Sequence, residues 1–387
     1  MGDEVFAYSG PKHMMVRVGS DSCPTTMMTI NWDSDEHRRC IAACLVQGTY
    51  VMECDQTRPW HHKALAPPWW ESFHFRLREV LEHECECMLC RTTFFRCGGA
   101  NRPWSIYGAI LEHVPPAGAR RHPSAPRYIV AFRGTVPRHP TFLGDMHLNL
   151  KILVNRQHDC GRFRDARRQV GELLDSTVVG VHVGSAAAVW LAGHSLGASI
   201  ALDVGRDMMT RRGHSLPTFL FNPPQVSLAP GMLPPALNKV AKGVIYPTSY
   251  VVKAALGTTV LRSHERHMEE VFERLAPWAP ELFVHERDAI CRGFIDYFEQ
   301  RQKMLERDRF RPVAEVAMKL SFRDMNRYMH HTDHENGKEQ RVRPHLLPSA
   351  RLWKSSSDGE PHGLQQWWQP DSRLKLSSRR YSYHNGA

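Results

Sequence analysis

The sequence predicts an α/β fold with a mostly parallel central sheet flanked by helices. Two observations lead to this fold class. Several short apolar runs are uninterrupted by polar residues, as expected of strands buried on both faces. Segments with helical spacing separate these runs, and strands that alternate with helices form parallel sheets. The runs are Tyr128–Phe132, Ala187–Ala192, Phe219–Phe221 and Leu282–Val284.

The N-terminal part predicts a helical extension followed by the main domain. Residues 1–58 are expected to pack on that domain as an extension, because Ile41–Val46 and Tyr50–Met52 share helical spacing. The α/β domain is expected over residues 59–376. Its first segments predict a loop rich in Pro, Trp and His, then a helix, then a strand. These are Trp60–Trp70, Phe73–Glu82 and Tyr107–Leu111.

Three further segments predict helices, and two others lie outside the regular alternation. The helices are expected at residues 160–178, Ala198–Met209 and Gly293–Arg307. Residues 225–280 are rich in proline and apolar groups, so we expect a cap over an active site. Residues 377–387 are expected to form a flexible tail, since chain ends fray unless they are packed.

The composition and the net charge of the chain indicate which kinds of molecule it could bind. The chain has 387 residues, of which 42% are hydrophobic and 23% charged, as in globular proteins that bury a core. The formal net charge is +10, which favours anionic surfaces such as acidic lipid or nucleic acid. The positive charges are spread along the sequence, which has no long run of Lys and Arg and no nucleic-acid-binding signature. We therefore expect no nucleic-acid partner, and keep contact with a membrane surface as an expectation.

The N-terminus and the cysteines predict a cytoplasmic protein with reduced thiols. The acidic segment Met1–Phe6 lacks the apolar run of a signal peptide, so the ten cysteines are not expected to form disulfides. Ser176–Leu202 carries no charged side chain and is long enough to cross a bilayer. Four glycines and two histidines interrupt it, however. We expect a strand, a tight turn and a buried helix there.

A cysteine-rich segment stands out at residues 84–102. Cys85, Cys87, Cys90 and Cys97 have the spacing C-x-C-x2-C-x6-C. Four thiolates could hold zinc, but structural zinc sites usually carry paired C-x2-C motifs. We therefore expect a surface insertion and no metal ion.

The strongest chemical motif is Gly193-His-Ser-Leu-Gly197. An apolar strand ends at Ala192 and a helix of small residues begins at Ala198. A serine in a sharp strand-to-helix turn is the nucleophile elbow of α/β-hydrolases, in which side chains at the two glycine positions would collide with neighbouring backbone. The motif predicts Ser195 as a nucleophile. The alternative is a glycine-rich turn without catalysis.

A serine nucleophile needs a base and an acid, which follow it along the chain in this fold. Asp288 follows the strand Leu282–Val284 and is the expected acid, with Glu286 and Asp296 as weaker candidates. Asp288 could alternatively cap a helix. Among 23 histidines, His362 and His345 are the candidate bases, and His362 is preferred because an apolar segment follows it.

The oxyanion hole requires backbone N–H groups aimed at the developing negative charge. One is expected from Leu196, the residue after the nucleophile. The other is expected from Thr135, in the loop that ends the strand Tyr128–Phe132. The alternative for this loop is an ordinary turn at the end of a strand.

Taken together, these motifs resemble the class 3 (fungal-type) lipases, and more closely a plant branch of lipase-like α/β-hydrolases often labelled GDSL esterase/lipase. The resemblance spans most of residues 35–375 and departs from the family at the cysteine-rich insertion. Its motifs lie at Tyr128–Thr135, Trp190–Ala198, Phe219–Pro224, Asp288–Cys291, Leu346–Ala350 and His362–Trp368.

The resemblance implies Ser195 as nucleophile, Asp288 as acid, His362 as base, and Thr135 with Leu196 as oxyanion donors. It also implies hydrolysis of carboxylic esters in acylglycerols or related lipids through an acyl-enzyme, without a metal or organic cofactor. The alternative function is a lipase-like scaffold with weak or no activity that binds lipid or a protein partner. The sequence does not specify the acyl-chain length or the oligomeric state.

Overall fold

The fold is taken from a computed structural model of the chain. It describes residues 11–18, 25–56, 69–84, 104–135, 160–178, 188–225, 248–259, 262–321, 324–325 and 346–383. The predicted loop Trp60–Trp70 is therefore described only at its end. The cysteines of the 84–102 insertion and His345 lie outside the described residues.

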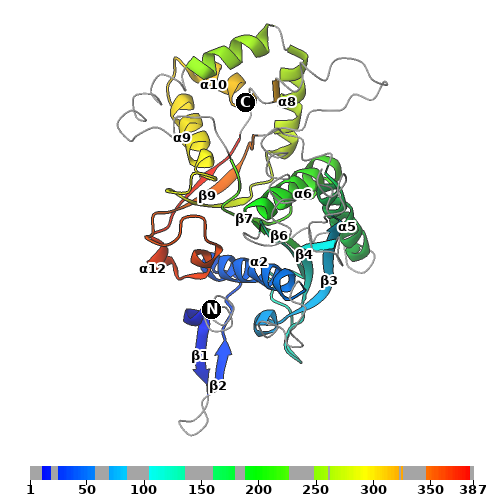
Figure 1. The fold of residues 1–387 in the computed structure, drawn as a ribbon. Coiled ribbons are helices and arrows are strands. Elements are labelled where there is room, and N and C mark those ends of the chain that lie inside the picture. Colours follow the sequence, from blue (N-terminus) through cyan, green and yellow to red (C-terminus); the bar gives the residue numbers. More distant parts are fainter. Residues whose placement is uncertain are drawn as a thin grey trace, which may run out of the picture.

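A mixed sheet of eight strands forms the centre of the molecule (Figure 1). Its spatial order is β10-β9-β8-β7-β6-β5-β4-β3, and neighbouring strands from β5 to β9 are parallel. The antiparallel pairs lie at its two ends. The predicted α/β fold with a mostly parallel sheet is confirmed. The strands are β3 (Phe75–Glu84), β4 (Trp104–His113), β5 (Tyr128–Phe132), β6 (Val189–His194), β7 (Thr218–Phe221), β8 (Glu281–His285), β9 (Ala350–Ser355) and β10 (Ser377–Tyr381).

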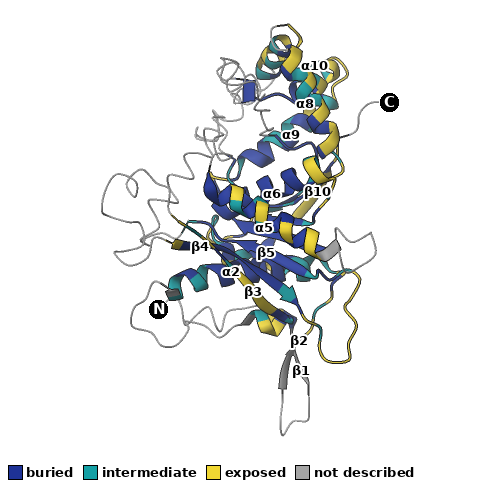
Figure 2. Ribbon diagram, turned by 90° about the vertical axis from the view of Figure 1, so that its right-hand side faces the viewer, coloured by how far each residue is buried: buried dark blue, intermediate teal, exposed yellow. Residues whose placement is uncertain are grey.

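Helices cover both faces of the sheet. α5 (Gly161–Val178) and α6 (Leu196–Arg212) pack on one face. α2 (Asp35–Gln56) crosses the other. Successive strand residues point to opposite faces, so Val130 lies in the core beneath α6 while Ile129 lies in the core beneath α2. This two-sided burial, visible as dark blue strands in Figure 2, explains why the central strands are uninterrupted apolar runs.

The first long helix also holds the C-terminal part of the chain. α2 packs against the short 3-10 helix η6 (Leu364–Trp368). The buried guanidinium of Arg39 donates to the backbone oxygens of Trp367 at 2.8 Å and Gln369 at 2.5 Å. It also pairs with the carboxylate of Asp371. α2 is therefore part of the core of the domain.

The remaining elements lie at opposite ends of the molecule (Figure 1). At one end are α8 (Arg262–Leu275), α9 (Gly293–Leu305) and α10 (Arg311–Ala317), together with a helix over residues 248–258. At the other end, β1 and β2 form an antiparallel hairpin. Among the described helices, none has the length and apolar character needed to span a bilayer. The smaller elements are β1 (Met15–Val18), β2 (Thr25–Met28), η1 (Lys12–Met14), η2 (Trp69–Phe73) and α12 (Asp371–Leu374).

The predicted helix at Phe73–Glu82 is wrong. Only Phe73 belongs to a helix, as the last residue of η2, while Phe75–Glu82 forms most of β3. This strand pairs with β4 and contains register shifts after Leu77 and after Leu81. The segment is rich in Leu, Arg and Glu, which favour helices. Pairing with β4 overrides this preference, and the Arg and Glu side chains of this edge strand are exposed.

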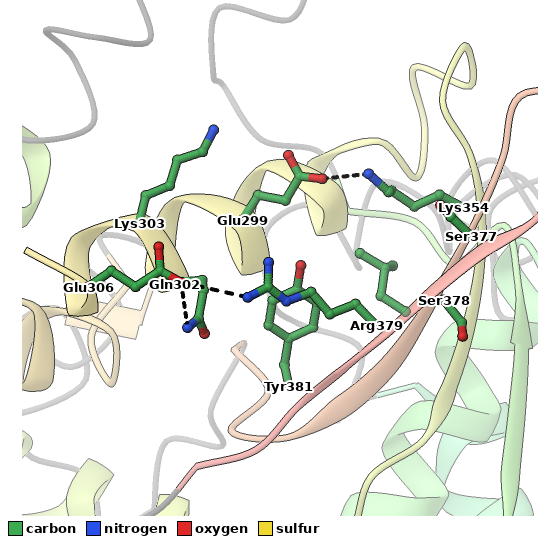
Figure 3. Close-up of a pocket in the computed structure, with 10 residues that line it drawn as sticks. Glu299, Gln302, Lys303, Glu306, Lys354, Ser377, Ser378, Arg379 and Tyr381 are labelled. Atoms are coloured by element: carbon green, nitrogen blue, oxygen red, sulfur yellow. Dashed lines mark hydrogen bonds and ion pairs between the residues drawn. The ribbon is translucent and has the colours of Figure 1, made fainter.

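The predicted flexible tail at residues 377–387 is also wrong over its described part. Ser377–Tyr381 forms β10, which pairs with β9, and the Tyr381 ring is buried. Figure 3 shows Arg379 of β10 pointing toward Glu306, the residue that follows α9, and the Arg379 Nη2 atom lies 3.6 Å from Glu306 Oε1. Pairing with β9 and burial of the Tyr381 ring therefore keep this segment in a strand, although its serines and arginines predict a flexible tail.

Candidate active site

The site is built around Ser195, a single residue that joins β6 to α6. Its backbone has a φ of 53°, in the left-handed region that residues other than glycine rarely adopt. The Ser195 N–H donates to the carbonyl oxygen of Phe221 at 2.9 Å, which ties the turn to β7. The abrupt passage from strand to helix imposes this conformation and places the side chain at the carboxyl edge of the sheet.

The two glycines of the motif are required by close backbone contacts. A Cβ on Gly193 would lie 2.3 Å from the carbonyl oxygen of Gly197. A Cβ on Gly197 would lie 2.2 Å from the carbonyl oxygen of Phe132 and 2.5 Å from that of Arg133. Neither position has room for a side chain. The loop after β5 therefore lies directly against the turn that carries Ser195.

Three side chains distant in sequence form a hydrogen-bonded chain at this edge. The Nε2 atom of His362 lies 3.0 Å from Ser195 Oγ, and its Nδ1 atom lies 2.7 Å from Asp288 Oδ2. A carboxylate only accepts, so Nδ1 carries the proton and donates to Asp288. Nε2 is then free to accept the proton of the Ser195 hydroxyl. The structure thus brings together the three residues expected from the sequence.

Asp288 lies in the loop between β8 and α9 and is almost completely buried. Its Oδ1 accepts from the Ile290 N–H at 2.9 Å. Its Oδ2 accepts from Asn222 Nδ2 at 2.7 Å and from the Cys291 thiol at 3.0 Å, besides His362. Burial acts to raise the pKa of Asp288, but the hydrogen bond and electrostatic interaction with His362, followed by the hydrogen bonds from Cys291 and Ile290, outweigh it and lower the pKa. Asp288 is therefore held as an anion.

The two expected oxyanion donors belong to α6 and to the loop after β5, which both contact the Ser195 turn. Leu196 is the first residue of α6, where backbone N–H groups have no acceptor within the helix. Thr135 is half-buried at the end of the loop that contacts the Ser195 turn. Their role as donors to a negative oxygen stays a prediction.

A second hydrogen-bonded chain lies behind the site. The Gly134 N–H donates to the Tyr50 hydroxyl oxygen at 2.7 Å, and that hydroxyl lies 2.8 Å from His194 Nδ1. His194 Nε2 lies 2.9 Å from the carbonyl oxygen of His362, so Nε2 carries the proton and Nδ1 accepts from Tyr50. Burial, followed by the proximity of His362, lowers the pKa of His194 to about 3. His194 is therefore neutral and links three segments of the site.

A buried ion pair supports the same loop. Arg133 Nη2 lies 3.1 Å from Glu53 Oε1, and both side chains are almost inaccessible to solvent. Arg133 Nε also donates to the Ile106 carbonyl oxygen at 2.5 Å, while Glu53 accepts from the Ile106 N–H at 2.7 Å. Sequence reasoning missed Tyr50 and Glu53. Their only signal is a spacing of three residues on α2, which places them on one face of the helix.

Neither a cluster of metal-ligating side chains nor either of two described cavities coincides with this site in the part of the chain that the structure describes. Among the described residues, no group of three or more His, Cys, Asp or Glu side chains is arranged to hold a metal ion. A cavity of about 340 Å³ lies between α9 and the β9–β10 edge (Figure 3). Another of about 490 Å³ lies beside Trp190 and Trp353. Neither is lined by Ser195, Asp288 or His362. Within the expected cap, residues 226–247 lie outside the described part of the chain.

Comparison with known proteins places the chain in a family. A protein of Arabidopsis thaliana named as a GDSL esterase/lipase is 31% identical over 376 residues, which cover 92% of this chain and 96% of the relative. The chain belongs to this esterase/lipase family. It is a carboxylic ester hydrolase, as the sequence predicted. No family model matches the chain. No solved structure matches it either.

Proposed function

We propose that the protein hydrolyses carboxylic esters through a Ser195–His362–Asp288 triad and an acyl-enzyme intermediate. The supporting observation is the continuous hydrogen-bonded chain from Asp288 through His362 to Ser195, with distances of 2.7 and 3.0 Å. An inactive scaffold that binds lipid or a protein partner has no need for these three groups to be aligned, so the geometry favours turnover.

In the first half-reaction, Ser195 Oγ attacks the ester carbonyl carbon while His362 Nε2 takes the hydroxyl proton. The negative charge on the carbonyl oxygen is stabilised by the N–H groups of Leu196 and Thr135. The C–O bond to the alcohol then breaks, and His362 returns its proton to the leaving alkoxide. This leaves an acyl group on Ser195 and releases the alcohol.

In the second half-reaction, His362 takes a proton from water, and the resulting hydroxide attacks the acyl carbon. The tetrahedral intermediate then collapses: the bond between the acyl carbon and Ser195 Oγ breaks, His362 returns its proton to Oγ, and the carboxylic acid is released. Asp288 holds the imidazole in the productive tautomer and stabilises its protonated form in both halves. The anionic state of Asp288 described above suits this role.

The substrate class that we propose is acylglycerols or related lipids, in a site of the class 3 (fungal-type) lipase kind. Two features support this. The Phe132-Arg-Gly-Thr135 loop lies against the Ser195 turn, and the base opens a short segment that ends in Trp367 and Trp368. The family relationship to an esterase/lipase agrees with an ester or lipid substrate.

The test compares wild type with Ser195→Ala. A fluorophosphonate probe should label the wild type and leave the variant unlabelled. Hydrolysis of p-nitrophenyl esters should fall by at least about a thousandfold in the variant. A series of acyl chains from acetate to palmitate, with a triacylglycerol emulsion, then defines the substrate class. The proposal is overturned if folded wild type is neither labelled nor active on any of these esters.

A further inference from the structure

Asn222 lies at the end of β7, in a position that the sequence marks only as the end of a strand. The residue is completely buried. Its φ of 47° lies in the left-handed region, which asparagine tolerates better than most side chains do. Its N–H donates to the Phe283 carbonyl oxygen at 2.9 Å, so the turn is joined to β8. This conformation directs the amide toward the loops that carry Asp288 and His362.

Every polar atom of the Asn222 side chain has a partner from one of these two loops. Nδ2 donates to Asp288 Oδ2 at 2.7 Å and to the Pro361 carbonyl oxygen at 2.9 Å. Oδ1 accepts from the Trp367 indole at 2.5 Å. Pro361 directly precedes His362, and Trp367 belongs to η6, which follows it. One amide therefore binds the acid and both sides of the segment that carries the base.

The chemistry of the partners fixes the orientation of this amide. The indole N–H of Trp367 is only a donor, so it must face Oδ1. The two N–H bonds of Nδ2 then face a carboxylate and a carbonyl, which are both acceptors. The flipped amide would place Oδ1 against two acceptors and Nδ2 against a donor, so one orientation is strongly favoured.

We propose that Asn222 is a positioning residue that holds Asp288 and His362 in register for proton transfer. The inference rests on the proposed triad, since it assigns these two residues as acid and base. Their separation depends on two loops from different parts of the sheet edge. Asn222 joins these loops directly, and productive proton transfer requires placement to within about 0.5 Å.

The ionisable groups around the pair make a pH profile informative. Besides Asp288 and His362 themselves, the groups in contact are Cys291 and His194. Burial and the nearby Asp288 raise the pKa of the Cys291 thiol. Burial and His362 lower the pKa of His194 to about 3. Both stay neutral between about pH 5 and 9, so the acid limb of activity reports the Asp288–His362 pair.

The experiment uses Asn222→Gly, Asn222→Asp and Trp367→Phe in the full chain. Glycine accepts the left-handed backbone and removes the amide. Aspartate has the same shape but replaces the donor with a carboxyl. Trp367→Phe keeps most of the ring and removes the donor that orients Asn222. Thr218→Val is the control, because Thr218 is a buried polar residue of β7 whose hydroxyl donates to the Leu216 carbonyl oxygen at 2.8 Å.

Active sites are first titrated with a fluorophosphonate, so that kcat refers to folded enzyme. We expect Asn222→Gly and Asn222→Asp to lower kcat for p-nitrophenyl acetate about 10- to 100-fold, with KM within twofold of wild type. In Asn222→Asp, the added carboxyl lies against Asp288 Oδ2, so the two carboxyl groups share one proton and the acid limb should differ from that of wild type. Trp367→Phe should lower kcat several-fold. Thr218→Val should leave kcat and the acid limb unchanged.

The inference is overturned if wild type is active through Ser195 but kcat per active site and the acid limb are unchanged in the Asn222 variants. If those variants do not fold, an unchanged kcat in Trp367→Phe overturns it. A wild type that is neither labelled nor active overturns the proposed triad instead, and this inference with it.

Discussion

Ser195 and its two glycines show how closely the nucleophile turn is packed. The left-handed φ of Ser195 persists only because backbone from β5, β6 and α6 surrounds it. Because of this packing, neither Gly193 nor Gly197 has room for even a methyl group. Substitution there should act on folding as well as on catalysis.

Gly197→Ala should destabilise the protein by about 3 kcal/mol and abolish labelling of Ser195. The added Cβ would lie 2.2 Å from the Phe132 carbonyl oxygen, so the β5 loop or the helix must shift. Urea unfolding of both proteins measures the change. Gly359→Ala is the control, because a Cβ there meets nothing within 4 Å, and its free energy of unfolding should stay within about 0.5 kcal/mol of wild type. Equal losses in both variants would contradict this account.

Stability should fall as the pH is lowered from about 6.5 toward 4. Burial lowers the pKa of His194 to about 3, and the pKa values of His113 and His264 to about 4. Below pH 6.5 these histidines are therefore protonated in the unfolded chain while they stay neutral in the folded chain. Stability is fully present above pH 6.5 and is lost as the pH falls toward these folded values, by about 1.4 kcal/mol per pH unit for each histidine.

His194→Gln tests this dependence at one residue. The variant loses one group that resists protonation, so its free energy of unfolding should decline less steeply with falling pH than that of wild type. Urea unfolding at pH 7, 6 and 5 gives the slopes. His122→Gln, at a half-exposed histidine, is the control and should keep the wild-type slope. Identical slopes in His194→Gln and wild type would refute the buried, neutral state of His194.

At the scale of elements, α2 is a structural support for the active site. One face of this helix presents Tyr50 to Gly134 and His194, and Glu53 to Arg133. These contacts reach the loop that carries Thr135, although α2 precedes every strand of the main sheet. Changes on α2 should therefore alter catalysis without touching any of the reacting groups.

Tyr50→Phe should lower kcat about tenfold and the free energy of unfolding by about 1–2 kcal/mol. The variant removes the acceptor of the Gly134 N–H and the donor to His194 Nδ1, which leaves two buried polar atoms without these partners. Ester hydrolysis and urea unfolding measure the two effects. Tyr128→Phe is the control, since the Tyr128 hydroxyl bonds to Glu112 at 3.3 Å, away from the site. An unchanged kcat in Tyr50→Phe would show that this contact from α2 does not affect catalysis.

The elements that the sequence predicted best are those defined by local patterns. The central strands and α6 could be predicted from local patterns. Strands buried on both faces are continuous apolar runs, and α6 has a run of small residues after the Ser195 turn. Ser195, Asp288 and His362 could be placed because each follows or opens such a segment. The residues that support this site could not be identified from the sequence. Tyr50 and His194 are 144 residues apart and Asn222 and Trp367 are 145 apart, and no local pattern marks such contacts.

The errors have a common physical cause. Phe73–Glu82 has helix-forming composition and β10 has the composition of an exposed tail. Both are edge strands, where only one side is covered and charged side chains are tolerated. Pairing with a neighbouring strand decides their structure, and in both cases that neighbour is not adjacent in the sequence.

For the whole molecule, the far edge of the sheet depends on residues close to the C-terminus. Tyr381→Ala should lower the free energy of unfolding by about 3 kcal/mol, because its buried ring stacks on Phe298 at a centroid distance of 4.9 Å. Thermal unfolding measures the loss. Ser378→Ala, at an exposed position on the same strand, is the control and should leave the melting temperature unchanged. A melting temperature for Tyr381→Ala equal to that of wild type would show that β10 contributes nothing to the fold.

The contact between Arg39 of α2 and the backbone of Trp367 joins residues 328 positions apart. It has a consequence for the order of events during synthesis. The nucleophile leaves the ribosome about 170 residues before the base, and the base is braced only when η6 reaches the first helix. On the proposed triad, a chain that ends before His362 carries Ser195 without its base. We therefore expect ester hydrolysis only after the C-terminal segment has been made and has folded onto α2.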